Sequence, residues 1–525
     1  MIFYKKNDIN RGCHIAILAL FIGIIYFYLQ YASEPLLGWY GSREVQTAIT
    51  AYWFDFHHLF KSLFFYETPL FGSPWSIPFE FPLFQLGAAG IHSITGIPLD
   101  ESGRWLSTLL YFCCFIPLYK IIKEIDLDKE YFYISAILIL LSPIYLYWSR
   151  AFLIESSALL TGFLFLWASI RFSKTNHIRW IFWMFVFGVL CSLIKITTFP
   201  SFVLAAFFSL VMLNSSNFSA ANVRGLFLKM VPLFVVLILC FIAAKSWTEQ
   251  ADDLKLTNEI GRALTSKNLQ GWNFGSLPQR FSSVLWKRTV IDRIIPHAVG
   301  STSCLFIIAV GILVGSNKQK ALIAILLLLF VAPILIFTNL HIVHDYYQYA
   351  NSFWLVLCLS LSLYIIKIRA SKLLFLILFI FVCWSDFSRF QQNYKKYIVD
   401  INAVRNDASN QERLDIAKKI RNSTPSNSII VLFGEDWSAE IPFYAERKSL
   451  MIPNWISSEK ALEILQNNQV YGGLDVSAVV VNHSQKISLQ DKEILKTFLN
   501  AHKNLNSVIQ LGYFDIYMNN LLSHY

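Results

Sequence analysis

The chain has 525 residues, of which 55% are hydrophobic, 16% aromatic and only 15% charged. This composition excludes an ordinary soluble domain and predicts an α-helical protein that crosses a membrane many times. The net charge of +10 does not indicate nucleic-acid binding, because the basic residues lie between apolar runs rather than on one face. The eight cysteines show no CxxC or Cys/His spacing, so a disulfide framework and a zinc finger are both unsupported.

About eleven apolar runs are long enough, or nearly so, to span a bilayer. The first follows a basic N-terminus without a small-residue cleavage site, so it is predicted to be a retained signal anchor. The predicted spans are Ile15–Leu29, Trp105–Ile122, Tyr131–Trp148, Ser156–Ile170, Trp180–Ile194, Phe202–Leu213, Met230–Ala244, Val299–Val314, Ala321–Phe337, Phe353–Ile366 and Leu373–Trp384.

A twelfth apolar stretch, Phe81–Ile97, determines the side on which every later loop lies. If it stays at the membrane surface, the short basic loops and the basic N-terminus all share one side, which is the cytoplasmic side by the positive-inside rule. We therefore expect a juxtamembrane or re-entrant helix there. The loops 35–104 and 248–297 and everything after Asp386 then lie outside.

The first outer loop gathers charged groups in an aromatic context. Residues 43–66 are expected to form a helix lying in the membrane interface with its aromatic side chains down. An aromatic belt that merely seats the protein would explain the phenylalanines equally well, but it does not explain Arg43 and Glu44. Further carboxylates in this loop are Asp55 and Glu80, and Glu80 is expected to orient the loop by pairing with a basic group.

Residues 389–525 are predicted to form a small soluble α/β domain, following a transmembrane domain over residues 1–388. Ser409 and Glu412 form a capping-box pattern at the start of a helix. Alternating strands and helices favour a parallel or mixed sheet, with a structural or docking role favoured over a catalytic one. The expected elements are helices ending at Asn422 and over Ser458–Asn467 and Leu489–His502, strands Ser428–Phe433 and Ser477–Val481, and a strand pair in Val508–Met518.

Two further constellations lie at the predicted outer ends of spans. Glu155 begins a span beside Arg150, where a carboxylate is costly unless it has a partner or a function. The helix dipole or an ion pair with Arg150 would also account for it. His341, His344, Asp345, Tyr346, Tyr347 and Gln348 crowd one short link, where they could contact a lipid phosphate, bind a divalent metal, or serve as interfacial tyrosines with satisfied histidines.

These residues resemble the GT-C superfamily of polyprenyl-phosphate-sugar-dependent glycosyltransferases, in its branch of protein mannosyltransferases and the lipid A aminoarabinose transferase. The resemblance is carried by Glu44 in GSREVQTA, by Glu80 in FEFPLFQ, by Arg104 opening the next helix, and by Glu155 in SRAFLIES. In the first third of the chain the resemblance rests on sequence motifs, and in the remainder it rests only on the order of spans, loops and the terminal domain. It implies transfer of a sugar from a polyprenyl-phosphate donor to a glycan, lipid or protein acceptor, at the outer face of a bacterial inner membrane.

In this resemblance Glu44 is the general base and Glu155 positions the acceptor or helps a cation. Two departures stand out: Gln46 lies where many relatives have aspartate, and Phe81 replaces the phosphate-binding lysine of the lipid A enzyme. The donor and its phosphate are then expected to be bound by other groups: Arg43, Glu80, Arg104, Arg150, His344, Asp345 and Tyr347.

We expect such a displacement to need no cofactor, and a role for a divalent metal stays an open alternative. A lipid-linked oligosaccharide flippase or other transporter is an alternative, but its ionisable residues would be expected at mid-membrane in repeated helices. An O-antigen-type polymerase is a second alternative, and it lacks the Glu-Phe-Pro-Leu element and the terminal α/β domain.

Overall fold

The computed structural model describes residues 6–54, 65–214, 220–400, 402–403, 409–484 and 489–519. Its contacts divide the chain into two compact units, each assembled from separate segments. Unit 1 comprises residues 1–32, 104–247 and 270–396, and unit 2 comprises residues 33–103, 248–269 and 397–525. The first outer loop thus groups with the C-terminal segment, whereas the predicted boundary at residue 388 stays a prediction.

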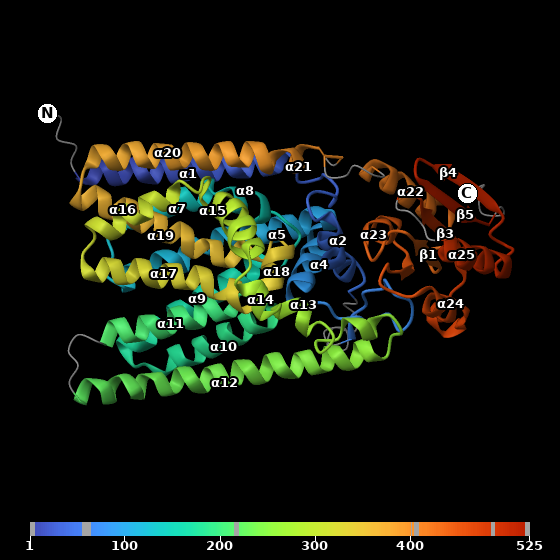
Figure 1. Ribbon diagram of the computed structural model, residues 1–525, viewed down its shortest axis with the longest axis horizontal. Helices are drawn as coiled ribbons and strands as arrows, with labels where there is room; N and C mark the ends of the chain where they lie inside the picture. Colours follow the sequence, from blue (N-terminus) through green and yellow to red (C-terminus); the bar gives the residue numbers. More distant parts are fainter. Residues whose placement is uncertain are drawn as a thin grey trace. The chain divides into compact units, whose positions relative to one another are not determined.

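Unit 1 is built from helices, most of which run roughly alongside one another (Figure 1). They are α1 (Lys6–Gln30), α5 (Leu99–Cys113, which begins in unit 2), α6 (Phe115–Glu124), α7 (Lys129–Leu141), α8 (Pro143–Trp148), α9 (Glu155–Thr175), α10 (Ile178–Ile194), α11 (Phe199–Asn214), α12 (Ala220–Leu256, which ends in unit 2), α13 (Gln270–Phe274), α14 (Leu277–Arg280), the π-helix η3 (Val284–Ile294), α15 (Ile295–Val299), α16 (Cys304–Val314), α17 (Asn317–Ile336), α18 (Thr338–Val343), α19 (Gln348–Arg369), α20 (Lys372–Asn393) and α21 (Lys395–Val399, which ends in unit 2).

The predicted apolar runs all fall in these helices, and the protein is a multi-pass membrane protein. Among the described residues, 7 helices are long and apolar enough to cross a membrane, or up to 8 if a pair bent by 82° counts as one span. The remaining predicted runs correspond to the shorter apolar helices α10 and α11 and to α7–α8, which Pro143 divides. The helix α4, Leu83–Thr95, has 13 residues and is too short to span, as expected for the surface stretch.

Helix α19 is the most buried span of unit 1, with 83% of its apolar window covered by neighbours. Small residues allow neighbouring helices of unit 1 to approach each other closely. A Cβ added to Gly311 of α16 would lie 2.6 Å from Ser362 Cβ of α19, and one added to Gly162 of α9 would lie 2.5 Å from the Phe202 ring of α11. Such small-residue contacts are typical of helices that pack within a membrane, where lipid tails are as apolar as the side chains.

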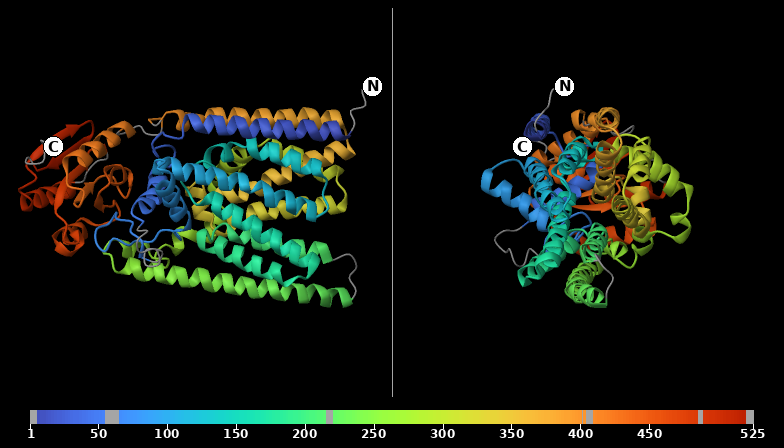
Figure 2. Two further views of the ribbon diagram at one scale, coloured as in Figure 1. Left: turned by 180° about the vertical axis from the view of Figure 1, so that it is seen from behind. Right: turned by 90° about the vertical axis from the view of Figure 1, so that its left-hand side faces the viewer.

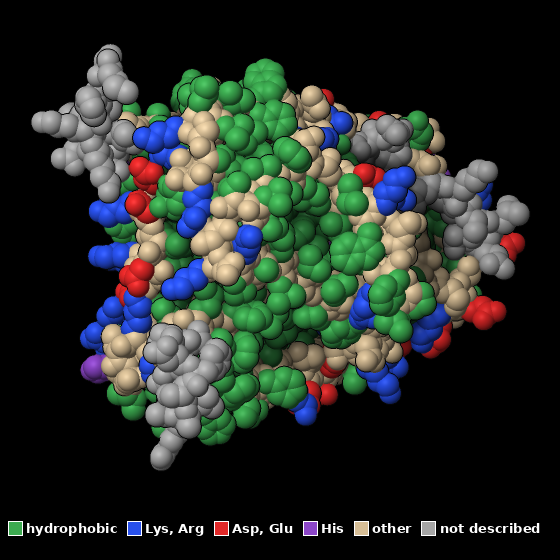
Figure 3. All heavy atoms as spheres, turned by 60° about the vertical axis from the view of Figure 1, so that its left-hand side comes forward, with side chains coloured by type: hydrophobic (Ala, Val, Ile, Leu, Met, Phe, Trp, Pro, Cys, Tyr) green, Lys and Arg blue, Asp and Glu red, His purple; other side chains and the backbone are tan. Residues whose placement is uncertain are grey.

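Helices α1 and α20 lie side by side in both views (Figures 1 and 2), with the rings of Phe27 and Phe390 6.0 Å apart. Their outer faces expose large apolar side chains, including Leu18 and Trp384. A space-filling view shows hydrophobic side chains over much of the face that it draws, with many lysines and arginines gathered toward its left-hand side (Figure 3). This pattern fits a lipid-facing surface bordered by basic loops.

Unit 2 contains a mixed five-stranded sheet in the order β2-β1-β3-β5-β4. Strand β1 is fully buried and pairs in parallel with both neighbours, whereas β5 pairs antiparallel with β3 and β4. The capping box at Ser409 is present. The elements are α2 (Gly41–Tyr52), α4, η2 (Gly261–Leu264), α22 (Asn410–Ser423), β1 (Ile429–Phe433), α23 (Glu440–Ala445), β2 (Lys448–Ile452), α24 (Ser458–Gln466), η4 (Asn468–Tyr471), β3 (Val476–Asn482), α25 (Leu489–Ala501), β4 (Ser507–Leu511) and β5 (Phe514–Met518).

The first outer loop extends this sheet beyond β2. Gly72 N donates to Ser449 O at 2.9 Å, Ser449 N to Pro69 O at 3.0 Å, and Met451 N to Leu70 O at 2.8 Å. Residues 69–72 therefore cover the outer edge of β2, which would otherwise leave unpaired N–H and C=O groups.

The predicted interfacial helix over residues 43–66 differs in the structure. Helix α2 ends at Tyr52, and residues 55–64, with Asp55, lie outside the described residues. The helix is also largely buried rather than surface-lying, because its apolar face packs within unit 2 against α4 and α23.

Candidate functional site

Glu44 lies in the first turn of α2 and is 4% exposed. The turn begins after Tyr40, whose left-handed φ of 61° reverses the chain into the helix. A Cβ at Gly41 would approach Leu36 O to 2.8 Å, so this entry requires a glycine. The unsatisfied N–H groups of a first helical turn favour a negative charge such as that of Glu44.

Glu80 is the hub of a polar network around α2. It forms an ion pair with Arg43, so the expected pairing with a basic group is present, whereas its orienting of the loop stays a prediction. Its Oε2 accepts from Gln85 Nε2 at 2.5 Å and from Thr47 Oγ1 at 3.3 Å, and its main-chain carbonyl accepts from Tyr66. Burial raises the pKa of Tyr66 well above its usual value, so this phenol stays a donor. The network fixes Arg43 relative to the helix that carries Glu44.

Glu155 begins α9 in unit 1 and is 4% exposed. It forms an ion pair with Lys195, which follows the last residue of α10. Lys195 Nζ also lies 5.1 Å from the centroid of the Tyr346 ring and 4.3 Å from that of Tyr347. A buried carboxylate, a buried ammonium group and two aromatic faces therefore meet in one place, and the rings stabilise the cation further.

A second cation, Arg293 of η3, lies in the same region of unit 1. Its Nη1 is 3.3 Å from Asp345 Oδ1, and it also donates to His341 O. His341 is 1% exposed, and its Nδ1 has no partner among the described residues. Burial, Lys195 and Arg293 lower the pKa of His341 to about 3, so the imidazole is neutral at ordinary pH. Gln348 donates to the carbonyls of His341 and His344, both at 3.1 Å, while its buried Oε1 has no partner in the described structure.

His344 and Tyr347 belong to this cluster, as expected, and neither is fully buried. Their ring centroids are 5.8 Å apart, and the His344 ring also lies 6.1 Å from Trp272 of α13. The structure thus brings Glu155, His344, Asp345 and Tyr347 together. Glu44, Arg43 and Glu80 lie in unit 2.

Arg104 and Arg150 have main-chain partners at the end of α1. Arg104 Nη1 donates to Ala32 O and Arg150 Nη2 to Tyr31 O, both at 2.8 Å. Arginines that bind the last carbonyls of a helix stabilise that end. These contacts give both residues a structural role, whereas the phosphate-binding role stays a prediction.

Lys195 and Arg293 were missed by sequence reasoning. A signal for Lys195 was present, because it is a basic residue in a short link that the predicted topology places outside, against the positive-inside rule. Arg293 carries no such signal, since it lies in a long polar segment with several other charged residues.

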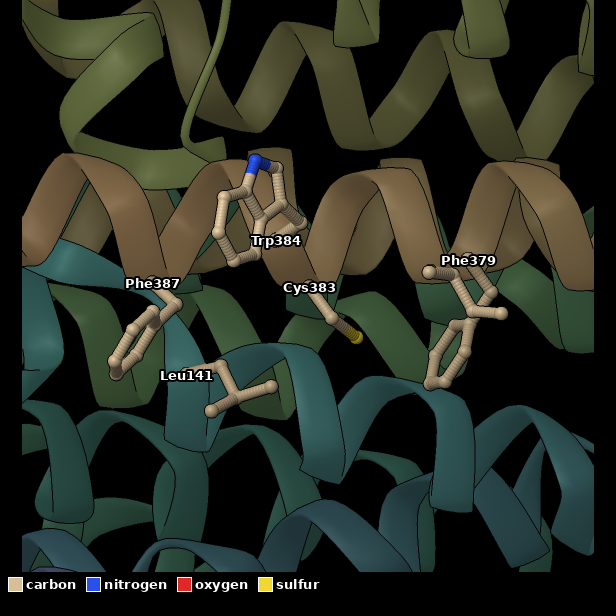
Figure 4. Close-up of a pocket in the computed structure, with 6 residues that line it drawn as sticks. Leu141, Phe379, Cys383, Trp384 and Phe387 are labelled. Carbon is tan, nitrogen blue, oxygen red and sulfur yellow. The ribbon is translucent and has the colours of Figure 1, made fainter.

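No group of three or more His, Cys, Asp or Glu side chains within the described ranges could hold a metal ion. The expected metal alternative therefore has no ligand set there. A groove of about 360 Å³ between α7 and α20 is apolar (Figure 4), and no charged side chain lines it. It is lined by Leu141, Phe379, Ile380, Cys383, Trp384 and Phe387.

A family model for dolichyl-phosphate-mannose-protein mannosyltransferase matches residues 78–247, which include Glu80, Glu155 and Lys195. ArnT from Cupriavidus metallidurans, bound to undecaprenyl phosphate, has a similar fold with a TM-score of 0.57 at 11% identity, over 96% of this chain and 98% of that chain. The resemblance to the GT-C superfamily is confirmed. The family model supports it for the sequence of residues 78–247, and ArnT supports it for the fold.

Weaker structural matches accompany this GT-C likeness. Apo ArnT from the same organism has a TM-score of 0.46 at 10% identity, over 97% of this chain and 98% of that chain. The arabinofuranosyltransferase AftD from mycobacteria has a TM-score of 0.49 at 14% identity, and the match covers 98% of this chain but 40% of AftD. No curated protein matches the chain.

Proposed function

We propose that the chain is an integral-membrane glycosyltransferase that moves a sugar from a polyprenyl-phosphate donor to an acceptor on the outer face of the membrane. The mannosyltransferase family model and the fold shared with an ArnT that binds undecaprenyl phosphate support this class. The acceptor is a glycan, lipid or protein, and the membrane is a bacterial inner membrane.

The observation that carries the proposal is the buried Lys195 cluster in unit 1. Lys195 and Arg293 supply two positive charges, and the Nδ1 of His341 has no partner in the described structure. Because a phosphate monoanion or dianion needs fixed cations and hydrogen-bonding groups, this cluster is suited to hold the phosphate of a lipid-linked sugar. Glu155 and Asp345 balance the two cations, so the cluster offers cationic hydrogen-bond donors held in place, which Phe81 cannot offer, rather than a net positive charge.

His344, Asp345 and Tyr347, which are predicted to bind the donor phosphate, belong to this cluster. Asp345 holds Arg293 through its carboxylate, and Tyr347 packs against Lys195 through its ring. Glu155 pairs with the single positive charge of Lys195 and fixes its position. The resemblance implies that Glu155 positions the acceptor or helps a cation. We propose that this cation is Lys195 and that Glu155 acts through it.

The transfer is a substitution at the anomeric carbon. The acceptor hydroxyl oxygen forms a bond to that carbon while the bond from the carbon to the phosphate oxygen breaks, and the leaving polyprenyl phosphate keeps the electron pair. The acceptor proton passes to the carboxylate of Glu44, acting as general base. Lys195 and Arg293 stabilise the charge on the leaving phosphate.

Mass spectrometry of a deletion strain tests the class of reaction. Loss of the enzyme should cause a lipid-linked sugar to accumulate and a sugar to disappear from an outer glycan, lipid or protein. In parallel, the purified full chain should bind undecaprenyl phosphate, and Lys195→Met should weaken binding far more than Lys120→Met, which removes an exposed lysine at the predicted cytoplasmic end of α6. Unchanged lipid-linked sugars together with no binding by the wild type would refute the proposal.

A further inference from the structure

Helix α2 is attached to the last quarter of the chain through side chains that lie far away in sequence. Gln46 Nε2 donates to the main-chain carbonyl of Trp437 at 3.1 Å, and Asn410 Nδ2 donates to Leu37 O at 2.8 Å. These residues all belong to unit 2.

Tyr444 of α23 connects both ends of the first outer loop to the same segment. Its hydroxyl accepts from Leu36 N at 2.6 Å and donates to Asp100 Oδ2 at 2.9 Å. Leu36 precedes α2, and Asp100 lies in the first turn of α5. One phenol therefore closes a loop of more than sixty residues, which limits the conformations open to α2.

Gln46 uses both ends of its amide. Its Nε2 donates to Trp437 O, while its Oε1 accepts from Arg43 Nη1 at 3.4 Å. The side chain is 5% exposed, so water cannot readily replace either partner. A carboxylate at this position could accept from Arg43 but could not donate to a carbonyl. The Gln46 amide, with one donor end and one acceptor end, therefore connects the C-terminal segment to the Arg43–Glu80 pair.

We propose that Gln46 is a positioning residue through which the C-terminal α/β segment sets the orientation of α2, and with it Arg43 and Glu44. This inference rests on the proposed function, since it assigns the C-terminal segment a role in the same transfer. The helix carries the general base, so a small rotation of α2 would displace the carboxylate from the acceptor hydroxyl. A displacement of about 1 Å costs on the order of a hundredfold in rate.

Two substitutions separate the two ends of the amide. Gln46→Met keeps the length of the side chain and removes both hydrogen bonds, whereas Gln46→Glu keeps an acceptor for Arg43 and removes the donor to Trp437. Gln411→Glu is the matched control, because the Gln411 amide lies on an exposed face of α22 and bonds only to Asp415 among the described residues. All variants are made in the full chain.

Hydrogen-exchange mass spectrometry is the first readout. Amides of α2 should exchange about fivefold faster or more in both Gln46 variants, because both lose the hydrogen bond to Trp437 O and a net hydrogen bond contributes about 1 kcal/mol. Amides of β1, β3 and α19 should be unchanged in both Gln46 variants, and the amides of α2 should be unchanged in Gln411→Glu. Unchanged exchange in α2 would overturn the proposal, and this result does not depend on whether the chain transfers a sugar.

Kinetics and undecaprenyl phosphate binding are the second readout, once the wild type shows transfer. Turnover should fall roughly 10- to 100-fold in the Gln46 variants while the KM for the donor stays within about twofold. Affinity for undecaprenyl phosphate and the fraction of folded protein should match the wild type. A fall in turnover that merely follows loss of folded protein, or one accompanied by weaker lipid binding, would indicate a structural role and overturn the positioning role. Wild-type protein that neither binds the lipid nor transfers a sugar would instead refute the proposed function.

Discussion

Replacing Lys195 by methionine should destabilise unit 1 and weaken phosphate binding by separate mechanisms. The side chain of Lys195 is 9% exposed and that of Glu155 is 3% exposed, so the substitution leaves a buried carboxylate without its cation. Breaking a buried pair in this way costs about 3–5 kcal/mol, whereas replacing both partners by neutral groups costs much less. The double variant Lys195→Met with Glu155→Gln should therefore unfold at a temperature close to that of the wild type.

The double variant should recover stability without recovering ligand binding. Loss of a charged hydrogen bond to phosphate is worth about 1.5–3 kcal/mol, or roughly ten- to a hundredfold in affinity for undecaprenyl phosphate. Thermal unfolding and lipid binding of the wild type, both single variants and the double variant complete the cycle. If Lys195→Met were as stable as the wild type, the buried pair would not be formed. If the double variant bound undecaprenyl phosphate normally, Lys195 would not contact the phosphate.

Three further outcomes follow from the same geometry. Reporter fusions at Lys174 and Ser426 should report opposite sides of the membrane, and finding both on one side would contradict the loop assignment. Replacing His344 or Tyr347 should weaken donor binding with the fold intact, and unchanged affinity in both variants would return these residues to an interfacial role. Since His341 has a pKa of about 3 in the fold against 6.5 for a free histidine, its neutral form contributes stability that is present above pH 6.5 and lost as the pH falls toward 3. The melting temperature should therefore drop between pH 7 and pH 4, and His341→Gln should drop less.

The apolar runs predicted the helices because a membrane span has a length and composition that a sequence displays directly. The residues at which these helices begin and end were less predictable. Helix α12 extends from Ala220 to Leu256, well beyond the apolar run at Met230–Ala244, because helix-forming polar residues continue it. The C-terminal strands β1 and β3 were predicted from their buried β-branched runs. Strand β2 was missed, since its short sequence KSLMI is stabilised by pairing with β1 and with residues 69–72.

The candidate site was also predictable from the sequence only in part. Carboxylates such as Glu44 and Glu155 stand out because they interrupt apolar or aromatic sequence. Their partners do not, because the pairing of Glu155 with Lys195 joins residues forty positions apart and depends on how two helices pack. Arg104 and Arg150 looked equally suitable for a phosphate, and only the fold shows that each binds a carbonyl at the end of α1.

The most direct test of the account is the turnover of Glu44→Gln. The substitution keeps the size and hydrogen-bonding capacity of the side chain but removes its ability to accept a proton. Transfer from the polyprenyl-phosphate donor should fall by roughly two to four orders of magnitude, while expression and undecaprenyl phosphate binding stay close to those of the wild type. Near-normal turnover in Glu44→Gln, with turnover lost in Glu80→Gln or Asp55→Asn, would contradict the assignment of Glu44 and place the base on another carboxylate of the same loop.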